Sequence, residues 1–254
     1  MRRLFKKLNI VVFSVFLGSF WGPSPAFADR SLLKDWNGDG QVILLAFGDS
    51  ITFGVGDKPN SGGYPTRLAE LSGVRVINGG VPGEEFLGGG SRRLINLIRG
   101  TEADVILIME GTNDAVRRAD SGALRAEFQK IINAARYLEK PIALLKPPSP
   151  CCDHSSIIPF VDSYSDIIGY LTSINDIRVV DVKLAWETTC QDRLNCELYN
   201  LPEGLHPNSR GYDVIAQTVL AALVGIDIFV AGGAAKLESA FNLPAGTIIV
   251  KPKE

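Results

Sequence analysis

Short apolar runs alternate with longer segments of helical periodicity along the chain from residue 42 onward. The apolar runs have the length and composition of buried strands. They are Val42–Phe47, Val74–Ile77, Val105–Met109, Ile142–Leu145 and Ile177–Val182. The segments of helical periodicity are Tyr64–Leu71, Ser91–Ile98, Ala123–Leu138, Ile157–Thr172 and Tyr212–Leu223. The pattern predicts strands and helices in alternation.

This alternation is typical of a parallel sheet with helices on both faces, because parallel strands need a long crossover connection and a helix supplies it. We therefore predict an α/β fold with three layers, α/β/α, around a five-stranded parallel sheet. In open sheets of this class, ligands bind at the carboxyl ends of the strands. Functional residues are expected in the segments that follow each strand.

The first residues have the layout of a secretory signal peptide. Basic residues at positions 2, 3, 6 and 7 precede an apolar run from residue 8 to 21, and Ala26-Phe27-Ala28 follows. We expect cleavage near Ala28 and a protein exported to the periplasm or the extracellular space. An uncleaved anchor is disfavoured, because the run is shorter than the ~20 residues of a spanning helix and ends in prolines. No cysteine lies near Ala28, which disfavours a lipid anchor.

The rest of the chain is interpreted as a lead-in at residues 29–41, one catalytic domain at 42–224 and an extension at 225–254. The extension contains a predicted short helix near Ala234–Phe241 and an apolar run at Thr247–Val250. We interpret it as a terminal segment packed on the domain or partly disordered. A surface or oligomer contact is the alternative.

The lead-in resembles the first half of a calcium-binding loop. Asp35, Asn37 and Asp39 stand at alternate positions and Gly40 follows. The twelfth position of such a loop needs a glutamate with two ligand oxygens, but Ala46 occupies it. The segment is therefore predicted to be a polar turn before the first strand.

The composition is that of an ordinary globular protein, with 46% hydrophobic and 21% charged residues among 254. The formal net charge is −2 and becomes more negative once the basic signal segment is removed. A mildly acidic chain without basic clusters gives no electrostatic basis for binding nucleic acid. The expected partner is a small molecule, and the oligomeric state is not fixed by the sequence.

Four cysteines stand in two pairs, Cys151 with Cys152 and Cys190 with Cys196. Disulfides persist in the oxidising compartments that an exported protein enters, so we expect at least one bridge. We expect it to join the Cys151-Cys152 segment to Cys190 or Cys196; a bridge between Cys190 and Cys196 stays open, because connectivity cannot be deduced from sequence. A zinc site is disfavoured because the spacing matches no zinc motif and His154 is the one imidazole nearby.

Polar and glycine-rich motifs follow four of the predicted strands. They are Gly48-Asp49-Ser50-Ile51-Thr52, Asn78-Gly79-Gly80-Val81-Pro82-Gly83-Glu84, Glu110-Gly111-Thr112-Asn113-Asp114 and, after a long loop, Glu203-Gly204-Leu205-His206-Pro207-Asn208. A serine at a sheet edge is a candidate nucleophile, and glycine N–H and asparagine amide groups are the donors that an oxyanion hole needs. Taken alone, each motif also fits an ordinary turn or helix cap.

In this order, the four motifs resemble the GDSL or SGNH hydrolase family over roughly residues 42–224, and most closely its bacterial thioesterase, lysophospholipase and arylesterase branch. The resemblance implies a flavodoxin-like sheet and a serine esterase without metal or cofactor. It implies that Ser50 is the nucleophile and His206 the general base. The oxyanion hole would then consist of the N–H groups of Ser50 and Gly83 and the side-chain amide of Asn113.

One position departs from the family pattern. The family has an aspartate three residues before the histidine, whereas this chain has Glu203. A glutamate can also accept a hydrogen bond from the imidazole N–H and fix its tautomer, so Glu203 is the expected orienting residue. A backbone carbonyl group, or another carboxylate such as Asp213, is the alternative.

These residues predict ester hydrolysis through an acyl-enzyme, in which Ser50 attacks the ester carbonyl while His206 takes its proton. No feature of the sequence selects the acyl length, and thioesters and lysophospholipids are variants of the same chemistry. A polysaccharide O-acetyl esterase and a non-catalytic binding protein on the same fold are the alternatives. Because Gly-x-Ser-x-Gly is absent, an α/β-hydrolase with a nucleophile elbow is disfavoured.

Overall fold

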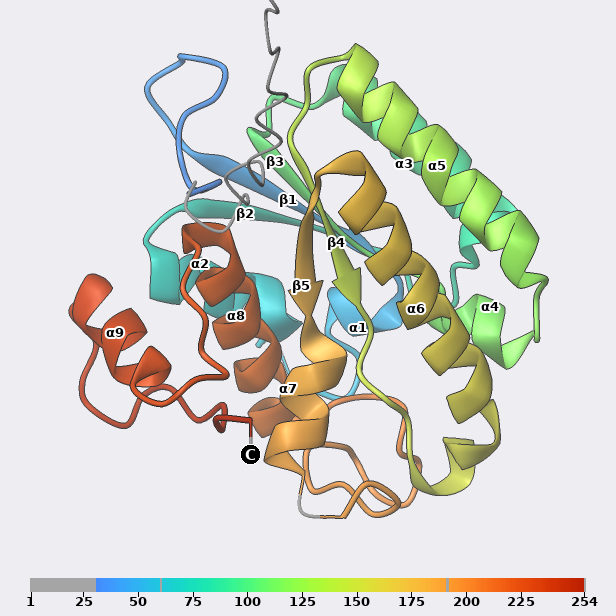
Figure 1. The fold of residues 1–254 in the computed structure, drawn as a ribbon, viewed down its shortest axis with the longest axis vertical. Helices are drawn as coiled ribbons and strands as arrows, with labels where there is room; N and C mark the ends of the chain where they lie inside the picture. The colour runs from blue at the N-terminus through green and yellow to red at the C-terminus, as the bar shows by residue number, and fades with distance from the viewer. Residues whose placement is uncertain (1–30, 60, 191, 254) are drawn as a thin grey trace, which may run out of the picture.

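The computed structural model describes residues 31–59, 61–190 and 192–253, so the signal peptide predicted for residues 1–28 lies outside it. A five-stranded sheet forms its centre (Figure 1). The strands are β1 (Ile43–Gly48), β2 (Arg75–Gly80), β3 (Val105–Met109), β4 (Ile142–Lys146) and β5 (Arg178–Asp181). All pairs are parallel and the order is β2-β1-β3-β4-β5. This is the flavodoxin-like order, which confirms the predicted fold class.

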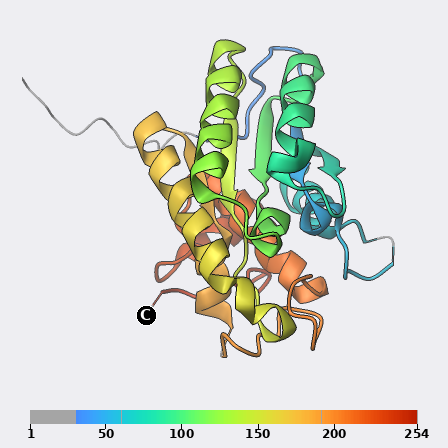
Figure 2. The same ribbon diagram turned by 90° about the vertical axis from the view of Figure 1, so that its right-hand side faces the viewer.

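Helices cover both faces of the sheet. They are α1 (Ser50–Phe53), α2 (Gly63–Ser72), α3 (Ser91–Gly100), α4 (Thr112–Val116), α5 (Ser121–Tyr137), α6 (Ile158–Asn175), α7 (Val182–Thr189), α8 (Ser209–Val224) and α9 (Gly233–Ala240), with shorter turns η2 (Phe86–Gly90) and η3 (Cys152–Ile157). One face carries α2, α7 and α8, and the other carries α3, α5 and α6, which stand side by side in Figure 2.

The central strands explain the two apolar layers. Successive side chains of a strand point to opposite faces, so a strand between two helix layers must be apolar at every position. In β1, Leu44 and Ala46 pack in the core beneath α2 and α8, whereas Ile43, Leu45 and Phe47 pack in the core beneath α3 and α5. This requirement explains why the buried strands appear in the sequence as continuous apolar runs.

Helix α7 was not predicted from the sequence. The apolar run of β5 continues into Val182 without a glycine or proline, so the strand was expected to extend to Val182. The structure ends β5 at Asp181, whose carboxylate accepts a hydrogen bond from the Leu184 N–H at 3.0 Å. Asp181 is therefore the N-cap of α7, and an aspartate at that place was the available signal.

The C-terminal extension packs on α8. The side-chain amide of Gln217 pairs with the main chain of the extension, donating to the Thr247 carbonyl at 2.9 Å and accepting from the Ile249 N–H at 2.8 Å. Leu237 of α9 and Ile248 join the core on that face. No helix within the described ranges is both long and apolar enough to cross a membrane.

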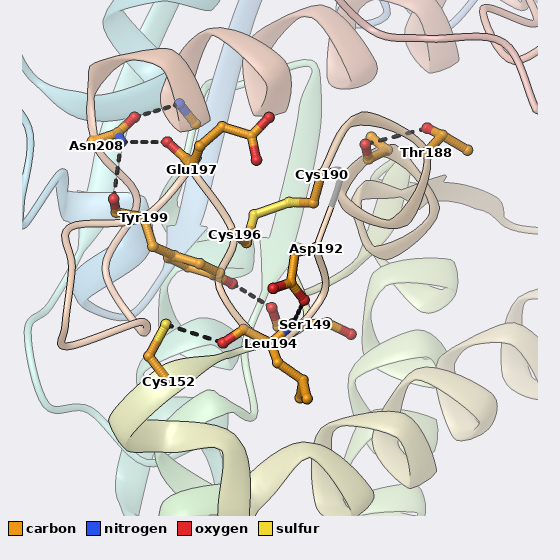
Figure 3. Close-up of a disulfide and its surroundings, with 12 residues drawn as sticks. Ser149, Cys152, Thr188, Cys190, Asp192, Leu194, Cys196, Glu197, Tyr199 and Asn208 are labelled. Carbon is orange, nitrogen blue, oxygen red and sulfur yellow. Dashed lines mark hydrogen bonds between the residues drawn. A yellow bond between two sulfur atoms is a disulfide. The ribbon is translucent and has the colours of Figure 1, made fainter.

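The disulfide joins Cys190 to Cys196, across the segment between α7 and the loop that leads to α8 (Figure 3). The expected bridge to the Cys151-Cys152 segment is therefore wrong, and the pairing left open is the one present. Both cysteines of that segment are free thiols. The Cys151 thiol is buried, and the Cys152 thiol is directed at the carbonyl oxygen of Leu194, 3.5 Å away.

Candidate active site

The turn after β1 presents Ser50 at the carboxyl edge of the sheet. Asp49 caps the short helix α1, because its carboxylate accepts a hydrogen bond from the Ile51 N–H at 2.8 Å. Ser50 is the first residue of that helix, and only 8% of its surface is exposed. Its N–H belongs to the first helical turn, where main-chain N–H groups have no partner within the helix.

His206 lies against Ser50. Its Nε2 atom is 2.9 Å from Ser50 Oγ, and its Nδ1 atom contacts a carboxylate oxygen of Glu203. A carboxylate only accepts, so Nδ1 carries the hydrogen and Nε2 is left to accept the serine hydroxyl proton. This is the tautomer that a general base for Ser50 requires.

Glu203 holds His206 at two points. One carboxylate oxygen contacts Nδ1, and the other accepts the His206 main-chain N–H at 3.0 Å. The alternative carboxylate lies elsewhere, because Asp213 accepts from Arg67 Nε at 2.6 Å. The geometry therefore places Glu203, and not Asp213, beside the imidazole.

Two side chains that the sequence did not single out for this role hold the loop of His206. Asn200 donates from Nδ2 to the His206 carbonyl at 3.1 Å and to the Gly56 carbonyl at 2.9 Å. His154 donates from Nδ1 to the Glu203 carbonyl at 2.7 Å. Both side chains bond main-chain carbonyl groups, and the sequence pattern does not indicate such contacts.

Gly204 allows the loop to pass close to the Cys151 segment. Its φ is +71°, and a Cβ atom built on it would lie 2.4 Å from the Cys151 carbonyl oxygen. The Cys151 N–H donates in turn to the Gly204 carbonyl at 2.8 Å. Any side chain at this position would push Glu203 and His206 away from their places.

The proposed oxyanion donors are next to the nucleophile turn. The Asn113 amide donates to the main-chain carbonyl of Glu84 at 2.9 Å and lies 3.5 Å from the carboxylate of Asp49. It therefore touches the residue before Ser50 and the residue after Gly83. Gly83 has a φ of +77°, in the left-handed region that favours glycine.

Buried carboxyl groups surround this turn. Burial raises the pKa of Asp49 to about 7, and the nearby carboxylates of Asp114 and Glu84 act in the same direction. Burial likewise raises the pKa of Glu110 well above its usual range. An uncharged carboxyl group is the form that such surroundings favour at neutral pH.

A wide groove runs beside Gly83. Its cavity volume is about 570 Å³, and it is open to solvent. The lining residues are Val81, Pro82, Gly83, Glu84, Glu85, Gly88, Gly89 and Gly90. Glycine backbone and two glutamates make this wall largely polar.

Among the described residues, the cysteine, histidine and carboxylate atoms that gather closely enough to hold a metal are those of Cys190, Cys196 and Glu197. The two sulfur atoms of this set are bonded to each other in the disulfide. A sulfur in a disulfide has no thiolate to offer a metal ion.

Known proteins are similar to this chain in sequence and fold. The model of the GDSL-like Lipase/Acylhydrolase family matches residues 46–214. An arylesterase of Vibrio mimicus is 25% identical over 189 residues, which cover 71% of this chain and 88% of the relative.

Solved structures show the same fold. The acetylxylan esterase Axe2 of Geobacillus stearothermophilus superposes with a TM-score of 0.60 at 21% identity, covering 72% of this chain and 94% of that one. The acetyl xylan esterase AlAXEase superposes with a TM-score of 0.61 at 23% identity, covering 72% of this chain and all of that one. At this identity the likeness concerns the fold.

Proposed function

The chain belongs to the GDSL-like Lipase/Acylhydrolase family and is a serine hydrolase of ester bonds, and we propose that it is exported and cleaves carboxylic esters of small or lipid-like acyl groups. Ser50 is the nucleophile, His206 the general acid and base, and Glu203 the orienting carboxylate. The observation that carries this proposal is the continuous chain of contacts from Ser50 Oγ through the imidazole to the Glu203 carboxylate.

The reaction proceeds in two steps. Ser50 Oγ attacks the ester carbonyl carbon while His206 Nε2 takes the hydroxyl proton, and the imidazolium then protonates the leaving alkoxide. Water hydrolyses the acyl-enzyme with the same histidine as base. The oxyanion accepts hydrogen bonds from the N–H groups of Ser50 and Gly83 and from the amide of Asn113.

Export is supported by two features. The first residues have the charge and apolar pattern of a signal peptide with a cleavage site near Ala28. The Cys190–Cys196 disulfide fits an oxidising compartment. Secretion of the full-length chain from a bacterial host, with a mature N-terminus near residue 29 by mass spectrometry, is the expected result.

The serine mechanism is tested with a series of nitrophenyl esters from acetyl to long acyl chains. We expect Ser50→Ala to reduce hydrolysis to background and His206→Ala to lower kcat by about 10²–10⁴-fold, the usual contribution of general acid–base catalysis. Ser173→Ala is the matched control, because Ser173 is exposed on α6 and its hydroxyl group donates to the Tyr170 carbonyl of the same helix. Full activity in Ser50→Ala would reject the assignment.

A second candidate substrate is an O-acetylated polysaccharide. The wide polar groove beside Gly83 favours it, because it gives an extended sugar chain room next to the proposed oxyanion hole. An acetylated xylooligosaccharide and nitrophenyl acetate distinguish the two candidates. A sugar ester esterase should have a much higher kcat/KM for the oligosaccharide, whereas a simple esterase should show no gain from the sugar.

A further inference from the structure

Arg93 and Glu84 form an ion pair next to Gly83, and the reaction above does not use it. Arg93, near the start of α3, donates from Nε to the Glu84 carboxylate at 2.8 Å, and its Nη2 contacts the same carboxylate. The other N–H groups of this guanidinium reach the Gly79 carbonyl at 3.0 Å and the Gly48 carbonyl at 3.4 Å. One side chain thus joins the ends of β1 and β2 to the loop that follows β2.

The pair is partly buried. The Arg93 guanidinium carbon lies 4.0 Å from the centre of the Phe47 ring, and the side chains of Arg93 and Glu84 are 28% and 12% exposed. The next residue offers a contrast, because Glu85 pairs with Arg117, whose side chain is 71% exposed. A partly buried contact with two parallel hydrogen bonds favours one geometry, whereas an exposed ion pair contributes little.

Glu84 connects this pair to the oxyanion donors. Its main-chain carbonyl accepts the Asn113 amide at 2.9 Å, and Gly83 directly precedes it in the chain. Fixing the side chain of Glu84 therefore fixes the peptide that orients the Asn113 amide. A shift of the Glu84 main chain is therefore expected to disturb both the Asn113 amide, which bonds its carbonyl group, and the adjacent Gly83.

Glu110 adds a second carboxyl group near Glu84. It is buried at the end of β3, and neither of its oxygens has a hydrogen-bond partner among the described residues. Burial raises the pKa of this carboxyl group well above its usual range, and the nearby carboxylates of Asp49 and Glu84 act in the same direction. The guanidinium of Arg93 is therefore the cation that holds Glu84 in a cluster of acidic groups.

We propose that Arg93, acting through Glu84, is a positioning residue of the oxyanion hole: it holds the Glu84 peptide in the place from which Asn113 and Gly83 face the Ser50 turn. The proposal rests on the proposed function of Ser50 and its partners. It assigns Arg93 no contact with the substrate. Its effect is on the stabilisation of the transition state, because oxyanion donors act there more strongly than in the ground state.

The test compares Arg93→Met, Arg93→Lys and Glu84→Gln with the control Arg117→Met, which removes the exposed neighbouring pair. Hydrolysis of nitrophenyl acetate gives kcat and KM, and inhibition by a boronic acid, whose adduct with serine is tetrahedral, reports the oxyanion site. Complete loss of one oxyanion donor costs about 10²–10³-fold in kcat, so misplacement of donors in Arg93→Met should cost roughly 10–100-fold. KM should change less than about threefold, and the inhibition constant should rise in parallel with the loss in kcat/KM.

Arg93→Lys should lie between the wild type and Arg93→Met, because lysine keeps the charge but not the fork. The proposal is overturned if folded Arg93→Met, by circular dichroism, keeps kcat within twofold, if its loss is all in KM, or if Arg117→Met loses as much. Where Arg93→Met does not fold, Arg93→Lys and Glu84→Gln decide by the same criteria. Wild-type protein that neither hydrolyses an ester nor reacts with a fluorophosphonate at Ser50 would instead reject the proposed function, and this proposal with it.

Discussion

At the scale of single residues, Glu203 does more than replace the shorter aspartate of the family. Its two oxygens bind the ring and the main chain of the same residue, His206. A carboxylate that is itself held by the backbone restricts the rotation of the imidazole. The carboxylate of Glu203 therefore attaches to His206 at two points.

Glu203→Gln should lower kcat by about 10²–10⁴-fold with little change in KM, because an amide stabilises neither the correct tautomer nor the imidazolium. Glu203→Asp should retain intermediate activity, because the charge remains and the reach shortens. Steady-state kinetics on nitrophenyl acetate measure both. Glu197→Gln, an exposed glutamate in the preceding loop, is the control, and wild-type kcat in Glu203→Gln would transfer the orienting role to another group.

Asp49 makes stability depend on pH. Its pKa in the folded protein is about 7, above the ordinary value of 3.8, because it is buried. Between these values the folded state binds more protons than the unfolded state, so this residue lowers the free energy of unfolding as the pH rises from about 4 to 7. Asp49→Asn removes this contribution. The free energy of unfolding of the variant, relative to that of the wild type, should therefore be higher at pH 8 than at pH 5.

Urea denaturation at both pH values measures the effect. Asp166→Asn changes an exposed carboxylate of α6 and should leave the pH dependence as it is in the wild type. An equal difference between wild type and Asp49→Asn at the two pH values would contradict the raised pKa. Part of the pH dependence of the free energy of unfolding should persist in Asp49→Asn, because Glu110 and Asp114 also have raised pKa values.

At the scale of elements, the sequence predicted what depends on local pattern. Strand β3 has the predicted limits, because all five of its residues are buried and apolar. Helix α7 escaped prediction because the strand was expected to continue through Asp181, the residue that caps the helix. Arg93 could not be told from its neighbour Arg92 in the sequence, since only the packing of α3 turns one toward Glu84 and the other to solvent.

Within the site, too, the sequence predicted what a local motif indicates and left open what depends on packing. The motifs indicated Ser50, Asn113 and His206, because the residue types and their order carry the resemblance. Glu203 was also the expected orienting residue, but a backbone carbonyl group and Asp213 stayed open as alternatives. The sequence could not decide between them, because the place of Glu203 depends on a loop that His154 and Asn200 hold by main-chain contacts.

An ionic network joins α2 to the start of α8. Arg67 of α2 donates from Nη2 to the Asp57 carboxylate at 2.9 Å and from Nε to Asp213 of α8 at 2.6 Å. The Asp57 side chain is 1% exposed and also accepts from Ser209 Oγ at 2.9 Å. Asp57 thus depends on Arg67 for its counter-charge.

Arg67→Met should lower the free energy of unfolding by about 3–5 kcal/mol, because it leaves the Asp57 carboxylate buried without its partner. The double variant with Asp57→Asn should recover part of this loss. Chemical denaturation measures both, with Arg99→Met, an exposed arginine of α3, as control. An additive loss in the double variant would show that the two residues do not act as a pair.

At the scale of the whole molecule, the C-terminal extension is part of the hydrophobic core. Leu237 is fully buried, and Ile228 and Ile248 join the same cluster as the residues of α8. The buried carboxylate of Glu238 accepts the Ile248 N–H at 2.9 Å, which closes the turn between α9 and the last residues. The domain that folds is therefore longer than the segment matched by the family.

Leu237→Ala should lower the free energy of unfolding by about 2–5 kcal/mol, the usual cost of a cavity at a buried leucine. The KM of the folded enzyme should stay unchanged, because none of the site contacts described above involves α9. Leu194→Ala is the control, since that leucine is 64% exposed. A stability equal to the wild type in Leu237→Ala would mean that the extension is not integrated into the core.

Ser50 and His206 are 156 positions apart in the chain, yet they lie within hydrogen-bonding distance. Neither half of the chain contains both residues of the proposed serine–histidine pair, so we expect no ester hydrolysis until the His206 loop has docked on the turn of Ser50. Recovery of activity during refolding should therefore report the docking of these two segments. Enzymatic assay can thus follow the folding of this protein at concentrations too low for spectroscopy.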